Sequence, residues 1–208
     1  MSNPDVRERI AFGAMAIAVA LRLASDWLFA SGGPFPYQLA QAALLGFALI
    51  LLWPRFETVF LKDRQHQLSV FEGLLALPLG LLLGLGTAWM SYGELKMPSP
   101  NLTALMIANN LFFPAVEELE FRGFLLGWLS RRKLPSLLAV ILVAVLHMLA
   151  HPHYLWEGKY VNALSVFLMG SWLGSLTLRT RSLWGAYVAH ALFNISYFLP
   201  LIGAGLAR

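Results

Sequence analysis

Three carboxylates and one guanidinium group lie within six residues of this chain, inside a stretch that is otherwise apolar. Glu117, Glu118 and Glu120 are followed by Arg122, and the apolar stretch extends from about residue 102 to residue 129. A carboxylate at membrane depth is costly unless it is paired, hydrated or neutralised. The cluster therefore indicates a polar cavity inside a helix bundle, which is the usual setting for chemistry or for ion movement.

Polar pairs spaced four residues apart occur on three separate apolar segments. An isolated pair of this kind often serves only helix packing. Three of them on successive long segments favour a shared site, because at about 1.5 Å rise per residue they reach overlapping depths in the bundle. The pairs are Glu118 with Arg122, His147 with His151, and His190 with Asn194. The first pair leaves Glu117 on an adjacent helix face, free to point elsewhere.

Membrane helices are the elements that must position these side chains. Of the 208 residues, 58% are hydrophobic and only 12% are charged, and the mean hydropathy is +0.65. A soluble domain would carry about a quarter charged residues. Several apolar runs reach the roughly 20 residues that span about 30 Å of hydrocarbon. We therefore expect an integral membrane protein whose outer surface contacts lipid.

The apolar segments predict an all-α fold, a multipass transmembrane helix bundle with about seven spans. Their approximate ranges are 10–30, 37–53, 70–92, 102–129, 137–151, 161–178 and 183–202. Pro114 predicts that the fourth helix is kinked or broken near that residue. Neither a repeat nor a long linker is visible, so residues 1–208 are expected to form a single integral membrane domain. The motifs lie in a core of about residues 102–199.

Basic residues indicate the orientation of the bundle in its membrane. With the N-terminus in the cytoplasm, ten Lys and Arg residues fall in cytoplasmic loops and three on the opposite side, as the positive-inside rule requires. The formal net charge of +4 then reflects these loops, and no pattern of a nucleic-acid surface is present. The absence of cysteine excludes disulfides and thiolate sites. Arg22 and Asp26 on the first helix are interpreted as a structural ion pair.

The combined pattern of motifs resembles the CPBP family of intramembrane proteases, which includes CAAX prenyl endopeptidases of the Rce type and bacteriocin-processing or Abi proteins. That pattern is Glu-Glu-x-x-x-Arg, then a helix ending in His, then His-x-x-x-Asn. The second motif of the family is Phe-x-x-x-His, and here His147 stands in place of the Phe. Both His147 and His151 are thus candidates for the catalytic histidine. We favour His151, which fits the family spacing and precedes Pro152. The resemblance covers about residues 102–199.

The resemblance implies an intramembrane endopeptidase that hydrolyses a peptide bond of a membrane-associated protein or peptide. Glu117 would activate a water molecule together with His151. His190 and Asn194 would stabilise the oxyanion. The residues that would support the site or orient the substrate are Glu118, Arg122 and His147. The small size of the chain favours a prokaryotic cytoplasmic membrane.

Two alternatives remain open at the level of the sequence. Zinc is a possible cofactor, with Glu117, His151 and His190 as ligands, although no metal is favoured and His-Glu-x-x-His is absent. A non-enzymatic membrane immunity or transport protein is the other alternative. A transporter is expected to show two related halves, and none is visible. The expected partners are membrane lipid and a protein or peptide substrate, with no nucleic acid; nothing indicates an oligomeric state.

Overall fold

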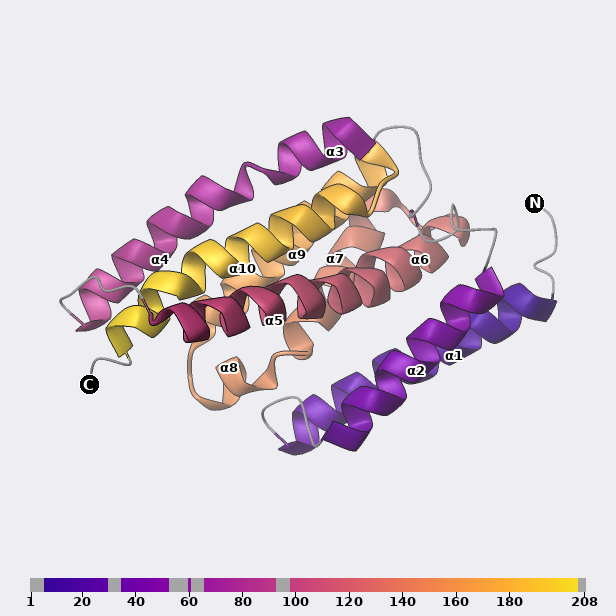
Figure 1. The fold of residues 1–208 in the computed structure, drawn as a ribbon. Coiled ribbons are helices and arrows are strands. Elements are labelled where there is room, and N and C mark those ends of the chain that lie inside the picture. Colours follow the sequence, from indigo (N-terminus) through magenta and orange to yellow (C-terminus); the bar gives the residue numbers. More distant parts are fainter. Residues whose placement is uncertain (1–5, 30–34, 53–59, 61–65, 93–97, 206–208) are drawn as a thin grey trace.

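The computed structural model describes residues 6–29, 35–52, 60, 66–92 and 98–205, and every regular element within these ranges is helical (Figure 1). This confirms the predicted all-α fold. In chain order the elements are α1 (Val6–Phe29), α2 (Phe35–Leu52), α3 (His66–Gly73), α4 (Ala76–Tyr92), α5 (Pro100–Glu118), the π-helix η2 (Leu119–Leu126), α6 (Gly127–Arg131), α7 (Ser136–Leu149), α8 (Pro152–Trp156), α9 (Tyr160–Thr180) and α10 (Trp184–Gly205).

Each predicted apolar segment coincides with one helix or with a run of consecutive helices. Among the described residues, two stretches are long and apolar enough to cross a membrane by length and composition, Gln67–Gly86 and Tyr160–Thr180. Shorter apolar helices cover Ala40–Leu52 and Ser136–Leu149. The helices are therefore where the sequence placed them, but a count of about seven spans is not confirmed.

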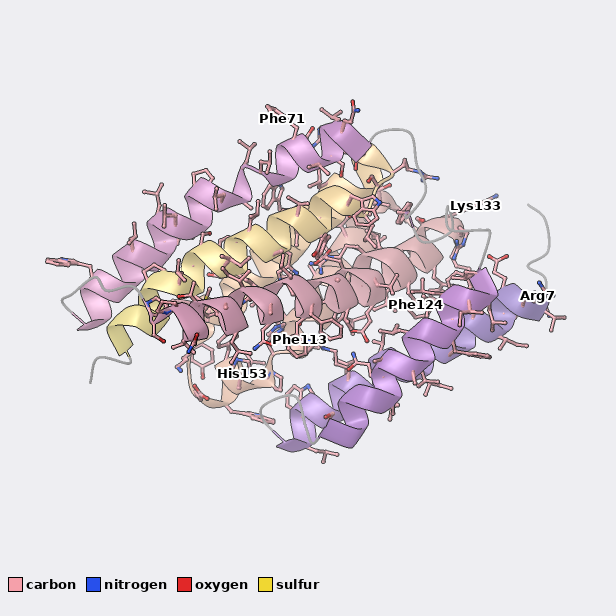
Figure 2. All side chains as sticks on the ribbon, in the orientation of Figure 1. Arg7, Phe71, Phe113, Phe124, Lys133 and His153 are labelled. Carbon is pink, nitrogen blue, oxygen red and sulfur yellow. The ribbon has the colours of Figure 1, made fainter. Side chains whose placement is uncertain are left out.

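Apolar side chains also cover much of the outer surface of the bundle. Figure 2 shows Phe71 on α3 pointing away from the other helices, and this side chain is 68% exposed. Ile50, Leu82 and Leu137, on three other helices, are similarly exposed. An exposed apolar surface of this extent is what contact with lipid requires.

The fourth predicted segment is not broken at Pro114. Helix α5 continues through Pro114 to Glu118, and α6 follows η2 without an intervening loop. In Figure 1 the three elements form one continuous rod, hereafter the central rod, through the middle of the molecule. A proline inside a buried helix removes one backbone hydrogen bond, and packing against neighbouring helices makes that tolerable. The irregularity appears instead as the π-helix, a geometry that is often found at functional sites.

Helices pack on both sides of the central rod. Helix α10 lies against α5, and α3 and α4 pack on α10 (Figure 1). Helices α7 and α9 pack on one another and also contact η2. The hairpin of α1 and α2 lies on the far side of the rod from α3 and α4, where α1 contacts η2 (Figure 1).

Glycines allow close helix approaches around the rod. A Cβ atom added to Gly84 of α4 would lie 2.4 Å from the carbonyl oxygen of Tyr197 in α10. A Cβ on Gly170 of α9 would lie 3.3 Å from the Cα of Ala144 in α7 and equally close to the Arg122 guanidinium. Small residues of this kind permit close backbone packing between membrane helices. They bring α4 close to α10, and α9 close to α7 and to the Arg122 side chain.

Apolar side chains of α1 and α7 pack against η2. Leu119 and Phe124 (Figure 2) pack with buried residues of α1. Phe121 and Leu126 pack with Val143 and other residues of α7. The polar side chains of the same segment are consequently enclosed within protein.

Candidate functional site

Five buried polar side chains meet where α5, η2, α7 and α10 come together. They are hereafter the buried cluster: Glu117, Glu118, Arg122, His147 and His190. None of them is more than 7% exposed. Buried charges of this kind are tolerated only when they are paired. Contacts within the cluster pair each charged group, and two buried atoms, Glu118 Oε2 and Arg122 Nε, have no hydrogen-bond partner among the described residues.

Glu118 and Arg122 form the ion pair that their spacing predicts. The Arg122 Nη1 atom lies 2.9 Å from Glu118 Oε1, and both side chains are fully buried. The Arg122 Nη2 atom lies 3.1 Å from Nδ1 of His147. Arg122 thus links the last turn of α5 to the end of α7.

The contact with Arg122 determines which nitrogen of His147 carries a hydrogen atom. A guanidinium group can only donate hydrogen bonds, so Nδ1 of His147 accepts one and Nε2 holds the ring proton of the neutral imidazole. The Nε2 atom lies 3.3 Å from Oε2 of Glu117. His147 therefore donates to Glu117 and is itself held by Arg122.

His190 lies between the two adjacent glutamates. Its Nδ1 atom is 2.7 Å from Glu118 Oε1, and its Nε2 atom is 3.6 Å from Glu117 Oε2. Asn194 is half-buried one turn further along α10. His190 of the third motif therefore contacts the first motif, with Glu118 orienting the His190 ring.

His151 occupies a different position from His147, because α7 ends at Leu149 and His151 is the N-cap residue before α8. Its Nδ1 atom lies 2.9 Å from the carbonyl oxygen of His147. A carbonyl oxygen only accepts, so Nδ1 is the donor and Nε2 of the neutral ring carries a free lone pair. His151 is only partly buried. Of the two histidines, His151 is the one with a ring nitrogen able to take up a proton.

The structure adds two polar residues, Arg22 and Gln41, that the sequence analysis did not place at the site. Arg22 of α1 contacts Glu117 at 2.5 Å and Glu120 at 3.4 Å. The Gln41 amide of α2 donates a hydrogen bond to Glu120. Arg22 was expected to pair with Asp26, whose side chain lies outside the described residues. A lone arginine in an apolar segment was the available signal, but its partner in α5 is 95 residues away.

The structure brings together a different set of possible zinc ligands from the set that the sequence predicted. Within the part of the chain that the structure describes, ligand atoms of Glu117, His147 and His151 lie within 4.8 Å of one another. Two of these residues already contact guanidinium groups, Glu117 with Arg22 and His147 with Arg122. A divalent cation bound at this position would experience repulsion from both guanidinium groups at short range.

Comparison with known proteins agrees with the motifs. The sequence model of the family described as type II CAAX prenyl endopeptidase Rce1-like matches residues 99–196. No curated protein matches the chain, and neither does any solved structure. The matched segment contains the whole buried cluster together with His151 and Asn194, and this confirms the resemblance to CPBP intramembrane proteases. Residues 99–196, slightly less than half of the chain, are thus similar to the Rce1-like family of integral membrane proteases, and this similarity points to protease activity.

Proposed function

We propose that the protein is an intramembrane endopeptidase in which Glu117 acts as the general base. The observation that carries this proposal is the arrangement around Glu117 Oε2, which faces Nε2 of His147 at 3.3 Å and Nε2 of His190 at 3.6 Å. The arrangement lies inside the family-matching segment and is shielded from bulk solvent. A carboxylate held against donors in a water-poor site is suited to activating a single water molecule.

Water activation uses Glu117 and His151. A water molecule beside Glu117 Oε2 gives its proton to the carboxylate as its oxygen attacks the carbonyl carbon of the peptide bond. When the tetrahedral intermediate collapses, the carbon–nitrogen bond breaks and that proton passes to the departing amine. The free lone pair on Nε2 of His151 positions the water and relays the proton.

Oxyanion stabilisation is assigned to His190 and Asn194 on α10. The Glu118 carboxylate accepts the Nδ1 hydrogen of His190 at 2.7 Å. In the protonated ring both nitrogens are donors, so Nε2 then donates toward the developing oxyanion. The Asn194 amide, one helical turn away, supplies a second donor.

Glu118, Arg122 and His147 are assigned to supporting the site. Arg122 holds both Glu118 and His147, and these two residues in turn orient His190 and Glu117. Such pre-organisation by hydrogen-bonded partners keeps reacting groups aligned. The substrate class that we propose is a membrane-associated protein or peptide, and zinc has no part in the proposed mechanism.

The proposal is tested by reconstituting the purified full-length protein into liposomes with a set of membrane-anchored reporter peptides. Mass spectrometry of the products detects new peptide termini, and a pH-sensitive dye inside the same liposomes detects proton flux. Cleavage by the wild type that disappears in Glu117→Gln supports the protease. Proton flux without cleavage of any reporter would instead support a transport protein.

A further inference from the structure

We propose that Arg22, which lies outside the family-matching segment, is a positioning residue for this hydrolysis. Its guanidinium group occupies Oε1 of Glu117 and thereby leaves Oε2 as the oxygen that receives the proton of the attacking water. The inference rests on the proposed function, because it assumes that Glu117 is the general base.

The two oxygens of Glu117 have different surroundings. Oε1 is 2.5 Å from the Nη2 atom of Arg22, and the two side chains are 9% and 14% exposed. Oε2 faces the Nε2 atoms of both His147 and His190. An arginine cannot accept a proton from water, since its guanidinium is always charged. Only the Oε2 side of the carboxylate therefore combines the two imidazoles with an oxygen that is not paired with a guanidinium group.

A second carboxylate holds Arg22 in this position. The Nη1 atom of Arg22 lies 3.4 Å from Glu120 Oε2, and the amide of Gln41 donates to Glu120 Oε1. Glu120 is fully buried. A continuous chain of contacts thus runs from Gln41 on α2 through Glu120 and Arg22 to Glu117. Both members of the α1–α2 hairpin take part in it.

The backbone of α1 is anchored on both sides of Arg22. Toward one end of the helix, the ring of Phe12 lies under the Arg131 guanidinium at 4.4 Å. Toward the other end, the Trp27 indole donates to the carbonyl oxygen of Leu149 at 2.9 Å and packs edge-on against Trp156. Leu149 lies two residues before His151. The same helix that places Arg22 at Glu117 therefore also contacts the segment that carries the second motif.

A positioning role predicts a specific kinetic signature. Without the guanidinium, the Glu117 carboxylate can rotate and present either oxygen to the imidazoles, so the fraction of productive geometries falls. Arg22 does not touch the substrate in this arrangement. Its removal should consequently lower kcat while KM stays near the wild-type value.

The experiment compares Arg22→Gln and Arg22→Lys with the wild type in liposomes, using a membrane-anchored reporter. We expect kcat of Arg22→Gln to fall about 10- to 100-fold, the range that small misplacements of a catalytic group produce. Arg22→Lys should recover part of that loss, because an ammonium group can still pair with Oε1. The matched control is Arg179→Gln, which removes an interhelical Arg–Glu pair with Glu72 outside the buried cluster, and it should retain wild-type kcat.

Wild-type kcat in Arg22→Gln, or a loss confined to KM, would overturn the inference. If Arg22→Gln yields no folded protein, Gln41→Leu is measured instead, since it removes one hydrogen bond and leaves every charge in place. A lower kcat at unchanged KM in Gln41→Leu supports the inference, and a wild-type kcat contradicts it. Measuring Glu117→Gln in parallel distinguishes failure of the Arg22 inference from failure of the proposed function. Full activity of Glu117→Gln would refute the proposed function itself.

Discussion

Arg122 donates a hydrogen bond to Nδ1 of His147 across 3.1 Å, and this contact distinguishes the two candidate histidines, of which the sequence analysis favoured His151. It forces the ring proton of neutral His147 onto Nε2, which faces Glu117. His151 instead donates from Nδ1 to a backbone carbonyl at 2.9 Å and keeps Nε2 as an acceptor. The geometry therefore favours His151 for proton transfer and His147 for support.

Substitution of the two histidines should have unequal effects. His151→Ala removes the acceptor nitrogen, and we expect kcat/KM to fall by about 10²- to 10⁴-fold, the range of general acid–base contributions. His147→Phe introduces the residue that the resembling family carries at this position, and it should retain a measurable share of activity. Initial rates on a membrane-anchored reporter provide the comparison. An inactive but folded His147→Phe, beside an active His151→Ala, would reverse the assignment.

Loss of the Glu118 charge should destabilise the protein as well as inactivate it. Glu118→Gln leaves the fully buried Arg122 guanidinium without its ion-pair partner, and breaking a buried pair costs about 3 to 5 kcal/mol. Thermal unfolding in detergent should show a clearly lower Tm than that of the wild type. The matched variant is Arg179→Gln, because the Arg179 side chain is 62% exposed. Exposed ion pairs contribute about 1 kcal/mol or less to the free energy of unfolding. Equal Tm values for the two variants would refute the buried-pair account.

Close packing of α4 on α10 should be required for activity. Gly84→Ala places a Cβ atom 2.4 Å from the Tyr197 carbonyl oxygen, which forces α10 to move together with His190 and Asn194. Overpacking of this kind costs about 1 to 3 kcal/mol, and kcat should fall with it. Gly86→Ala on the same helix meets no atom within 4 Å and serves as the control. Identical Tm and kcat in both variants would show that the helices do not approach as described.

Activity should not depend on a bound metal. The guanidinium groups of Arg22 and Arg122 contact Glu117 and His147, and their charge opposes that of a divalent cation. We expect the purified protein to contain no stoichiometric zinc by elemental analysis and to keep its rate after chelation. A rate that is lost with a chelator and restored by added zinc would assign the site to a metal, with Glu117 as a ligand.

The sequence predicted the helices and the motif spacings well, because both depend on local patterns. Apolar runs of span length identify helices without knowledge of their neighbours. The pairing of Glu118 with Arg122 follows from helical geometry alone. The convergence of the three motifs near Glu117 could be inferred because each motif combines costly polar groups with an apolar segment. The sequence analysis expected His151 beside Glu117, and the contact of His147 with Glu117 came from the structure.

Features that depend on tertiary packing could not be predicted in the same way. Pro114 suggested a kink or a break in the helix near that residue, whereas α5 continues through Pro114 and a π-helix begins at Leu119. No local residue signal marks the start of the π-helix. Arg22 and Gln41 reach Glu117 and Glu120 across sequence separations of 79 to 98 residues. A single sequence carries no information on such contacts, so the contribution of the α1–α2 hairpin emerged only from the structure.

The most direct measurement of the central claim is kcat/KM of Glu117→Gln against the wild type, in liposomes with a membrane-anchored reporter and with Tm measured on both proteins. The substitution keeps the size of the side chain and removes the base. The account predicts a loss of at least about 100-fold, within the range for a general base, in a protein that remains folded. Folded Glu117→Gln with a kcat/KM close to that of the wild type would contradict it.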